Sequence, residues 1–332
     1  MNKKNIGLVG AGYWGKNLVR VFAELGVLKT ICDTDKKVLA ERKKEHPQLK
    51  TTKNYNDLLK DKDIKGIVIS APAALHYKLS KKVLLSDKDV FVEKPLALKV
   101  KEAEKLVKLS EKKNLILMVG HLLLYHPAII ELKKIIKAKK LGEVQYIYSN
   151  RLNFGKLRTE ENVLWSFAPH DVAVMLDLFK EGSEKINKLK ISATANSYLQ
   201  KKINDFALVN FQFKNKKAGH VFVSWLNPFK EQKLVVIGAK KMAVFDDQSD
   251  KKLIIFNHKV KWKNKIPEAV KGKEEVIKIA RSEPLKEEAK YFLECIQKRK
   301  TSLTDGREGL EVLKVLDACQ KSIKNKGKLI NI

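Results

Sequence analysis

The sequence predicts an α/β protein with two domains: a doubly wound parallel sheet, followed by an α+β domain with a mostly antiparallel, open sheet. Two observations support this prediction. Residues 5–119 alternate short apolar strands with amphipathic helices, as βαβ units do, whereas residues 145–256 contain strand-like runs joined by short turns. The chain of 332 residues is also long enough for two cores. We place the domains at residues 1–122 and 123–332.

The first strand and the turn after it contain the most informative local motif. Residues 5–9 form an apolar strand, residues 10–15 have the sequence Gly-Ala-Gly-Tyr-Trp-Gly, and a helix is expected over residues 16–25. The pattern Gly-x-Gly-x-x-Gly between a strand and a helix is typical of dinucleotide binding. The turn therefore predicts a cofactor site at the start of the chain.

Each residue of this loop has an expected role. Gly10 permits the tight turn, Gly12 lets the backbone approach a pyrophosphate, and Gly15 lets the helix pack closely on the strand. The amino terminus of the helix presents free N–H groups to the phosphates. Tyr13 and Trp14 lie in the same loop, and we include them in the predicted cofactor-binding set.

An acidic residue ends the second strand. That strand is expected over residues 27–32, and Asp33 follows it. A carboxylate at this point can accept hydrogen bonds from the adenosine ribose and would repel a 2′-phosphate, which favours NAD over NADP. Lys36 and Lys37 oppose this preference. An alternative role for Asp33 is to cap the helix that follows.

The alternation of strands and helices continues to residue 119, which predicts a Rossmann fold with right-handed crossovers. The helices are expected over 56–60, 77–86 and 100–113, and the strands over 66–69, 88–92 and 115–119. The loop over 70–76 then lies at the carboxyl end of its strand, where such sheets bind ligands. We assign Ser70, Pro72 and His76 to the cofactor side. Two interpretations of His76 remain open: it caps its helix or lies at the surface, or it lines the cofactor cleft.

Glu93, Lys94 and Pro95 end the strand over 88–92 on the same side of the sheet. A partly desolvated ammonium group either pairs with an acceptor or has a shifted pKa. A lysine at this position is therefore more typical of a functional site than of a structural one. Lys94 is therefore a candidate catalytic residue as well as a cofactor contact, and Glu93 joins the cofactor-binding set.

After residue 120 the pattern changes to a helix over 123–139 and a series of strands. The strand-like runs are residues 145–150, 190–196, 205–213, 218–225, 233–237, 242–245 and 252–256. A mostly antiparallel sheet of this kind needs a cover on one face, and a helix near 165–179 is the candidate. Residues 257–281 are expected to be a basic, irregular excursion. Two final helices are expected over 284–300 and 305–323.

The stretch after the first of these strands has the polar composition of a substrate-binding loop. Arg151 and Arg158 are two of the seven arginines, and a guanidinium fork suits a carboxylate or phosphate. Trp165 can present its ring face to a sugar or base, and Asn153 and Asn162 add polar groups. The alternative is a solvated connector with a buried tryptophan.

His170 and Asp171 enter the amphipathic helix that we expect over residues 172–179. A lone histidine at a helix start is usually a cap or a buried polar group. It is also the residue type best suited to accept or donate a proton near neutral pH. His170 is therefore a second catalytic candidate, and Asp171 is a candidate to orient its ring.

Composition excludes several classes of protein. The longest apolar run is shorter than the roughly 20 residues that span a membrane, and the amino terminus lacks the pattern of a secretion signal, so we expect a cytoplasmic protein. Cys32, Cys295 and Cys319 form no Cys-x-x-Cys pair, and the spacing of the histidines matches no metal motif. We therefore predict neither a disulfide framework nor a metal.

The net charge of +30 could indicate a protein that binds nucleic acid, but the distribution of the charged residues argues against this interpretation. Of 68 basic residues only seven are arginine, and the lysines are spread over most helices and loops. Nucleic-acid readers concentrate charge in a stripe and favour arginine. A solvated lysine-rich surface is the preferred interpretation, and a field that attracts anionic substrates is the next.

Together these motifs resemble one known family. The glycine loop, Asp33, the loop from Ala71 to His76, the Glu-Lys-Pro segment and His170 with Asp171 are similar to the glucose–fructose oxidoreductase / inositol dehydrogenase / rhizopine catabolism family of NAD(P)-dependent sugar oxidoreductases. The resemblance implies that Lys94 lies beside the nicotinamide, that the bond before Pro95 is cis, and that His170 is the acid/base partner. It also implies a homodimer or homotetramer, and last helices, within 284–325, that return to the first domain. The family often has an aspartate where this chain has Ser166.

The expected reaction is hydride transfer from a secondary hydroxyl of a sugar to the nicotinamide, with the proton passing to a base. The substrate stretch resembles the branch that acts on sugar nucleotides, so a nucleotide-linked amino sugar or uronic acid is the first choice, for example in a UDP-sugar 3-dehydrogenase. The alternatives are a free polyol or inositol dehydrogenase and a non-catalytic NAD-binding regulator. Binding to nucleic acid is the least favoured reading.

Overall fold

The computed structural model describes residues 4–155, 157–180, 189–213 and 216–332. These residues form two compact units. The first unit joins Met1–Leu122 to Glu283–Leu313, and the second joins Leu123–Ser282 to Lys314–Ile332. Within the described ranges, no helix is both long and apolar enough to cross a membrane.

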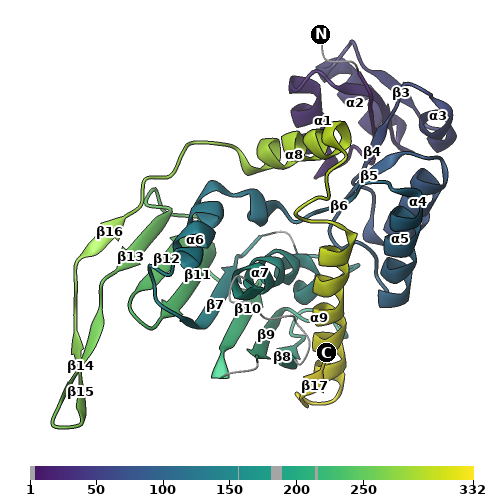
Figure 1. Cartoon of the computed structure of the whole chain (residues 1–332). Helices are drawn as coiled ribbons and strands as arrows, with labels where there is room; N and C mark the ends of the chain where they lie inside the picture. Colours follow the sequence, from purple (N-terminus) through teal and green to yellow (C-terminus); the bar gives the residue numbers. More distant parts are fainter. Residues whose placement is uncertain (1–3, 156, 181–188, 214–215) are drawn as a thin grey trace. The chain divides into compact units, whose positions relative to one another are not determined.

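A parallel sheet forms the centre of the first unit (Figure 1). Its described strands follow the order β3-β2-β1-β4-β5-β6. This is the order of a doubly wound sheet, which confirms the predicted fold class. The elements in chain order are β1 (Ile6–Val9), α1 (Gly15–Glu24), β2 (Leu28–Cys32), α2 (Lys36–Glu45), β3 (Lys50–Thr52), α3 (Tyr55–Lys60), β4 (Gly66–Ile69), α4 (Ala73–Leu85), β5 (Asp89–Glu93), α5 (Val100–Lys113) and β6 (Leu117–Gly120).

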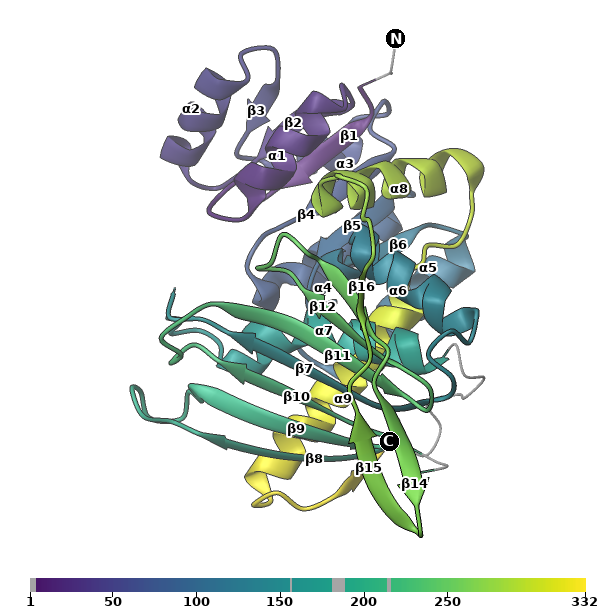
Figure 2. The same cartoon turned by 90° about the vertical axis from the view of Figure 1, so that its left-hand side faces the viewer.

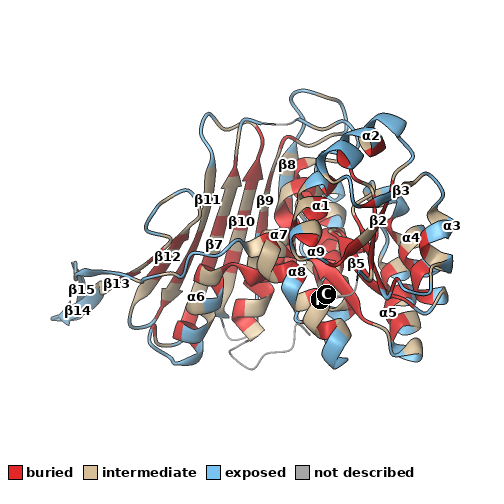
Figure 3. Ribbon diagram, turned by 90° about the horizontal axis from the view of Figure 1, so that it is seen from above, coloured by how far each residue is buried: buried red, intermediate tan, exposed pale blue. Residues whose placement is uncertain are grey.

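The central strands form because they are short, apolar and covered on both faces. Every residue of β1, β4, β5 and β6 is buried, which is the pattern of a parallel sheet between two layers of helices (Figure 3). No bounds were predicted from the sequence for two elements, α2 and β3. Helix α2 buries only Leu39 and Arg42, so its sequence carries almost no apolar periodicity.

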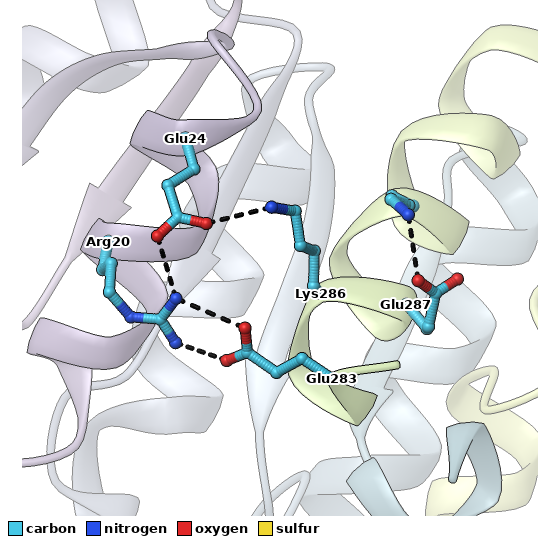
Figure 4. Close-up of polar contacts among 6 residues, drawn as sticks. Arg20, Glu24, Glu283, Lys286 and Glu287 are labelled. Atoms are coloured by element: carbon cyan, nitrogen blue, oxygen red, sulfur yellow. Dashed lines mark hydrogen bonds and ion pairs between the residues drawn. The ribbon is translucent and has the colours of Figure 1, made fainter. Parts of the chain in front are cut away.

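Helix α8 (Pro284–Lys298) also belongs to the first unit. Phe292 packs edge to face on Phe91 of β5, with ring centroids 5.6 Å apart. At the start of α8, Glu283 pairs with Arg20 of α1, and Lys286 contacts Glu24 at 3.0 Å (Figure 4). Exposed ion pairs contribute about 0–1 kcal/mol each, so the aromatic packing is the main attachment.

The second unit is built on a large sheet whose described strands follow the order β16-β13-β12-β11-β7-β10-β9-β8-β17. Strands β7 and β10 pair in parallel, and the other neighbours in the described sheet pair antiparallel, which confirms the mostly antiparallel prediction. The elements are η1 (Leu122–Tyr125), α6 (Pro127–Lys137), β7 (Val144–Leu152), α7 (Val163–Lys180), β8 (Lys190–Asn196), β9 (Phe206–Gln212), β10 (Ala218–Ser224), β11 (Glu231–Gly238), β12 (Met242–Asp246), β13 (Leu253–Phe256), β16 (Glu274–Val276) and β17 (Ile330–Asn331). Helix α9 (Gly306–Lys324) belongs to the first unit up to Leu313 and to the second unit from Lys314.

The two faces of this sheet differ. Helix α7 packs on β7, β9 and β10, as predicted, and α6 packs on β12. Alternate residues point to the opposite face, which we call the open face. There, Tyr148 of β7 lies beside Val235 of β11 and stacks on His220 of β10, with ring centroids 5.1 Å apart.

The expectation of an irregular excursion over residues 257–281 is wrong. These residues contain the hairpin of β14 (Lys259–Lys263) and β15 (Ile266–Val270), and then β16 (Figure 2). The sequence of β14, Lys-Val-Lys-Trp-Lys, alternates with the period of two that a strand requires, although the lysines obscured it.

Candidate active site

The glycine loop has the geometry of a phosphate-binding turn. Gly10 has φ of +85°, and a Cβ on Gly15 would lie 1.9 Å from the carbonyl oxygen of Gly10, so both positions require glycine. A Cβ on Gly12 would meet no atom within 4 Å, which leaves the backbone there open to a ligand. Helix α1 has no side-chain cap and no acidic residue in its first turn. Its amino terminus is therefore suited to a pyrophosphate.

Asp33 lies directly after β2 and holds two backbone N–H groups. Ala11 of the glycine loop donates to Oδ2 at 2.7 Å, and Asp35 donates to Oδ1 at 3.0 Å. The helix cap considered for Asp33 is instead supplied by Asp35, whose carboxylate accepts from the N–H of Lys37. Asp33 thus connects the glycine loop to the end of β2, the place from which a ribose would be recognised.

Glu93 joins the glycine loop to the segment that carries Lys94. The indole Nε1 of Trp14 donates to Glu93 Oε1 at 2.6 Å, and the backbone N–H of Lys94 donates to the same carboxylate. A Cβ on Gly120 would lie 3.1 Å from this carboxyl group, so glycine is needed beside it. Burial raises the pKa of Glu93, and the bonds from Trp14 and Lys94 oppose that rise.

The Lys94 side chain is half-buried, and the bond between Lys94 and Pro95 is cis, as the resemblance implied. Ser70, at the end of β4, donates its hydroxyl to the carbonyl oxygen of Gly10 at 2.6 Å. Pro72 immediately precedes α4. The carboxyl ends of β1, β4 and β5 are thus joined by side chains that the sequence assigned to the cofactor side.

His76 is neither a surface residue nor a cap of α4. It is 1% exposed and lies between two backbone carbonyl groups. Its Nδ1 is 2.7 Å from the carbonyl oxygen of Pro95, and its Nε2 is 2.8 Å from that of Ala71. The ring therefore connects the loop after β4 to the Glu-Lys-Pro segment.

The first unit contains a buried group of acidic side chains that was not predicted from the sequence. Glu288 of α8 is 1% exposed, and neither carboxyl oxygen has a hydrogen-bond partner. Burial, and then the charges of Glu93 and Glu308, raise the pKa of Glu288 well above its ordinary value. Glu308 accepts a bond from His121 Nδ1 at 2.6 Å. The apolar stripe of α8 could have indicated that Glu288 is buried, because this residue lies on the same face as Leu285, Ala289, Phe292 and Cys295.

This shift makes stability depend on pH. The pKa of Glu288 in the folded chain lies above the unfolded value of about 4.3. The contribution of the neutral carboxyl group to the stability of the fold is therefore complete below about pH 4.3. This contribution is lost as the pH rises through the pKa of the folded chain. Glu288→Gln, which cannot ionise, should therefore gain stability over the wild type by up to about 1.4 kcal/mol per pH unit across that window. Chemical denaturation at several pH values measures this.

Glu287→Gln is the matched control, because Glu287 is the next residue on α8 and its side chain, which pairs with Lys290, is 39% exposed. Its effect on the free energy of unfolding should be small and should not grow with pH above the ordinary carboxyl range. If the difference between Glu288→Gln and the wild type is the same at every pH, Glu288 is not held neutral.

In the second unit, His170 lies inside α7 rather than at a helix start, and Pro169 is within the same helix. His170 is half-buried, and the buried Ser166 lies one turn before it on the same face of α7. The position where the family often has an aspartate therefore lies on the same side of α7 as His170, but in this chain it carries a hydroxyl group. The helix start expected at residue 172 is wrong, because α7 begins at Val163, whereas the helix expected near residues 165–179 is present.

Asp171 is bound to Arg151 and Ser149. Arg151 donates from Nε at 2.5 Å and from Nη2 at 3.3 Å, and the Ser149 hydroxyl donates at 2.5 Å. The side chains of Arg151 and Asp171 are 12% and 4% exposed. This fork contact fixes α7 to β7, so the structure places Arg151 in an internal ion pair with Asp171, and Asp171 is shared between two donors.

The other predicted substrate residues fall into two groups. Asn162 accepts from the N–H of Trp165 at 3.2 Å, and both side chains reach Gln320 of α9, so they fix the start of α7. Arg158 lies 3.2 Å from Glu161 and keeps a third of its side chain exposed. Asn153 follows β7 and donates its backbone N–H to Ser224. Of the predicted substrate residues, Arg158 and Asn153 are therefore the two whose side chains are least engaged in holding helices and strands together.

Among the described residues, no group of three or more histidine, cysteine, aspartate or glutamate side chains could hold a metal ion. The three cysteines are free and buried. The first unit instead offers a glycine loop with an uncapped helix, the carboxylate of Asp33 directly after β2, and a lysine at the end of β5. This set fits a dinucleotide cofactor.

Comparison with protein families gives matches along nearly the whole chain. Residues 4–121 match the model of an oxidoreductase family with an NAD-binding Rossmann fold, and residues 133–330 match the C-terminal alpha/beta domain of the same oxidoreductase family.

Two curated relatives and two solved structures illustrate the similarity. UDP-N-acetylglucosamine 3-dehydrogenase of Acidithiobacillus ferrooxidans is 22% identical over 92% of this chain and 93% of its own length. Inositol 2-dehydrogenase of Salmonella typhimurium is 25% identical over 53% of this chain, and the match spans 54% of that protein. The structure of the Acidithiobacillus ferrooxidans enzyme has a TM-score of 0.84 at 20% identity, covering 97% of each chain. Levoglucosan dehydrogenase with NADH and levoglucosan has a TM-score of 0.83 at 17% identity, covering 99% of each chain.

Proposed function

We infer that this chain, which belongs to the glucose–fructose oxidoreductase / inositol dehydrogenase / rhizopine catabolism family of NAD-binding sugar oxidoreductases, oxidises a secondary hydroxyl of a nucleotide-linked sugar. The observation that supports this best is the contact between Trp14 and Glu93. Through it the segment that carries Lys94 is attached to the loop that would hold the cofactor phosphates. A lysine held beside a dinucleotide is suited to act on a hydroxyl group that reacts with the nicotinamide.

The cofactor would be held by the glycine loop at its pyrophosphate and by Asp33 at the adenosine ribose. We propose NAD rather than NADP because the Asp33 carboxylate would repel a 2′-phosphate. Asp33→Asn removes that charge and keeps an oxygen that can accept from Ala11. The ratio of kcat/KM for NAD to that for NADP should fall about tenfold, which corresponds to about 1.4 kcal/mol. Steady-state rates with each cofactor measure this ratio.

Asp35→Asn is the control, because Asp35 is an adjacent carboxylate that caps α2. It should leave the ratio within about twofold of the wild type. An unchanged ratio in Asp33→Asn would mean that Asp33 does not select the cofactor, and the preference for NAD would lose its basis.

We propose that Lys94 and His170 divide the chemistry between them. Bound NAD supplies the hydride acceptor. The Lys94 ammonium donates a hydrogen bond to the hydroxyl oxygen as negative charge develops on it, which is the kind of stabilisation that contributes most in such reactions. The His170 imidazole accepts the hydroxyl proton as the carbon loses its hydride, so the sugar leaves as a ketone and one proton remains to be released to solvent.

Three observations support a sugar nucleotide as the substrate. The similarity to UDP-N-acetylglucosamine 3-dehydrogenase extends over 92% of this chain. Arg158, with a third of its side chain exposed, can offer a guanidinium group to a diphosphate. The net charge of +30 attracts anionic substrates in general.

A panel of sugars tests the substrate class. NADH formation is followed with UDP- and dTDP-linked sugars, including UDP-N-acetylglucosamine, and with myo-inositol and other free polyols. We expect kcat/KM for one of the sugar nucleotides to exceed that for every free polyol by at least tenfold. The reverse order would identify a polyol dehydrogenase. NADH binding without turnover on any sugar would identify a regulatory protein.

We also propose that a second copy of the chain covers the open face of the second unit. Aromatic and aliphatic side chains, including Tyr148, Phe222 and Val244, lie on that face in register and are only partly buried. A sheet face that carries neighbouring aromatic and aliphatic side chains is a candidate for contact with another protein. Light scattering should give the mass of a dimer or tetramer, and the mass of a monomer would contradict the proposal.

A further inference from the structure

The two ring nitrogens of His76 both face carbonyl oxygens. Nδ1 lies 2.7 Å from the oxygen of Pro95, and Nε2 lies 2.8 Å from the oxygen of Ala71. A carbonyl oxygen accepts hydrogen bonds and cannot donate them. A neutral imidazole carries one N–H, so its second nitrogen would turn a lone pair toward the other carbonyl oxygen at hydrogen-bond distance, which is repulsive. The imidazolium carries two N–H groups and satisfies both contacts.

Burial and the helix end oppose the charged ring, whereas the two contacts with carbonyl oxygens favour it. His76 is 1% exposed and lies in the first two turns of α4, where the positive end of the helix dipole disfavours a cation. Each hydrogen bond from a charged donor is stronger than one from a neutral donor, and His76 makes two of them to fixed backbone groups. Hydrogen bonding to the charged form of a group favours that form, and both N–H groups of the imidazolium would have an acceptor here.

His76 also closes a ring of contacts around the carboxyl ends of three strands. Ser70 binds the Gly10 carbonyl, His76 binds Ala71 and Pro95, and Glu93 binds Trp14. Starting from the glycine loop, the contacts run through the loop after β4 to the segment after β5 and return to the glycine loop. The contact with Pro95 is one residue from Lys94. Without His76 the ring is open at the segment that carries the lysine.

We propose that His76 is a positioning residue for the dehydrogenase, held as an imidazolium between Ala71 and Pro95 so that the backbone carrying Lys94 is fixed relative to the cofactor loop. The proposal rests on the proposed function for its effect on turnover, but its protonation state does not depend on that function. Because His76 is 1% exposed, it would act through the orientation of Lys94 rather than by contact with the sugar.

The protonation state is tested in the full-length wild-type chain by nitrogen-15 NMR of its histidines at about pH 7.5. An ordinary imidazole, with a pKa of about 6.5, is mostly neutral there. We expect both ring nitrogens of His76 to give the shifts of protonated nitrogens. His220 is the internal control, because burial lowers the pKa of its ring, which should appear neutral. One unprotonated nitrogen in His76 would overturn the proposal, whatever the protein catalyses.

The positioning role is tested with His76→Gln, whose amide NH2 group can serve one carbonyl but not both. We expect kcat with the best sugar of the panel to fall about tenfold or more, while the Kd for NADH stays within about twofold. His46→Gln, at the end of α2, is the control and should match the wild type. An unchanged kcat, or an equal loss of kcat and NADH affinity together with a lower melting temperature, would assign His76 a purely structural role.

Discussion

Lys94→Ala should lower kcat about a hundredfold or more and leave the binding of NADH nearly unchanged. The reason is that the lysine ammonium is proposed to bind the substrate oxygen as its charge develops, an interaction made in the transition state. Removing a donor of this kind costs about 3–4 kcal/mol in enzymes that stabilise a developing oxyanion. Steady-state kinetics with the preferred sugar and a fluorescence titration with NADH separate the two effects.

Lys99→Ala is the matched control, because Lys99 is an exposed lysine five residues further along the chain, just before α5. It should retain the activity of the wild type. If Lys94→Ala lowers NADH affinity and kcat by the same factor, Lys94 is a cofactor contact. If it lowers neither, the account of the site is wrong.

His170→Asn should lower kcat by about two to four orders of magnitude, because it removes the proposed proton acceptor. Asparagine keeps a polar group of similar size inside α7, so the helix should still form. The pH dependence provides the sharper test. In the wild type kcat should rise with pH through the titration of an imidazole, and in the variant this limb should be absent.

His46→Asn is the control for this experiment and should keep both the rate and the pH profile. A variant of His170 that loses activity but keeps the rising limb would show that another group takes the proton. Lys94 would then be the first alternative, because a lysine whose ammonium is destabilised by burial can also act as a base.

The glycine loop was the easiest part of the site to predict, because its requirements are local. Gly10 needs a positive φ, and Gly15 has no room for a side chain beside Gly10. Both demands arise within six residues of chain, so they are visible in the sequence. The cis bond before Pro95 was likewise expected from a short motif, and it is present.

Contacts between distant residues were harder to predict. Asp171 was expected to orient a histidine, but it binds Arg151 and Ser149 of β7. These residues are about 20 positions apart in the chain, and they come into contact only because α7 packs on β7. The sequence pattern alone does not reveal such a contact. His76 is similar, because its two partners are carbonyl groups, which every residue carries and which no side-chain pattern can reveal.

The start of α7 and the strand β14 were assigned wrongly from the sequence. The helix was expected to begin at residue 172, but α7 contains Pro169, and proline removes a hydrogen bond from a helix interior. In α7, however, Val163, Leu164 and Ala168 are buried ahead of the proline, and this burial outweighs the lost bond. In β14, lysines at alternate positions resembled a solvated loop, although their spacing was that of a strand.

A crystal structure of the chain with NADH and UDP-N-acetylglucosamine would test the central claim most directly. The account predicts that the Lys94 ammonium and the His170 imidazole both lie within hydrogen-bond distance, about 2.6–3.2 Å, of one sugar hydroxyl over the nicotinamide. A complex in which either side chain points away from the sugar, into solvent or into the interior of its own unit, would contradict it.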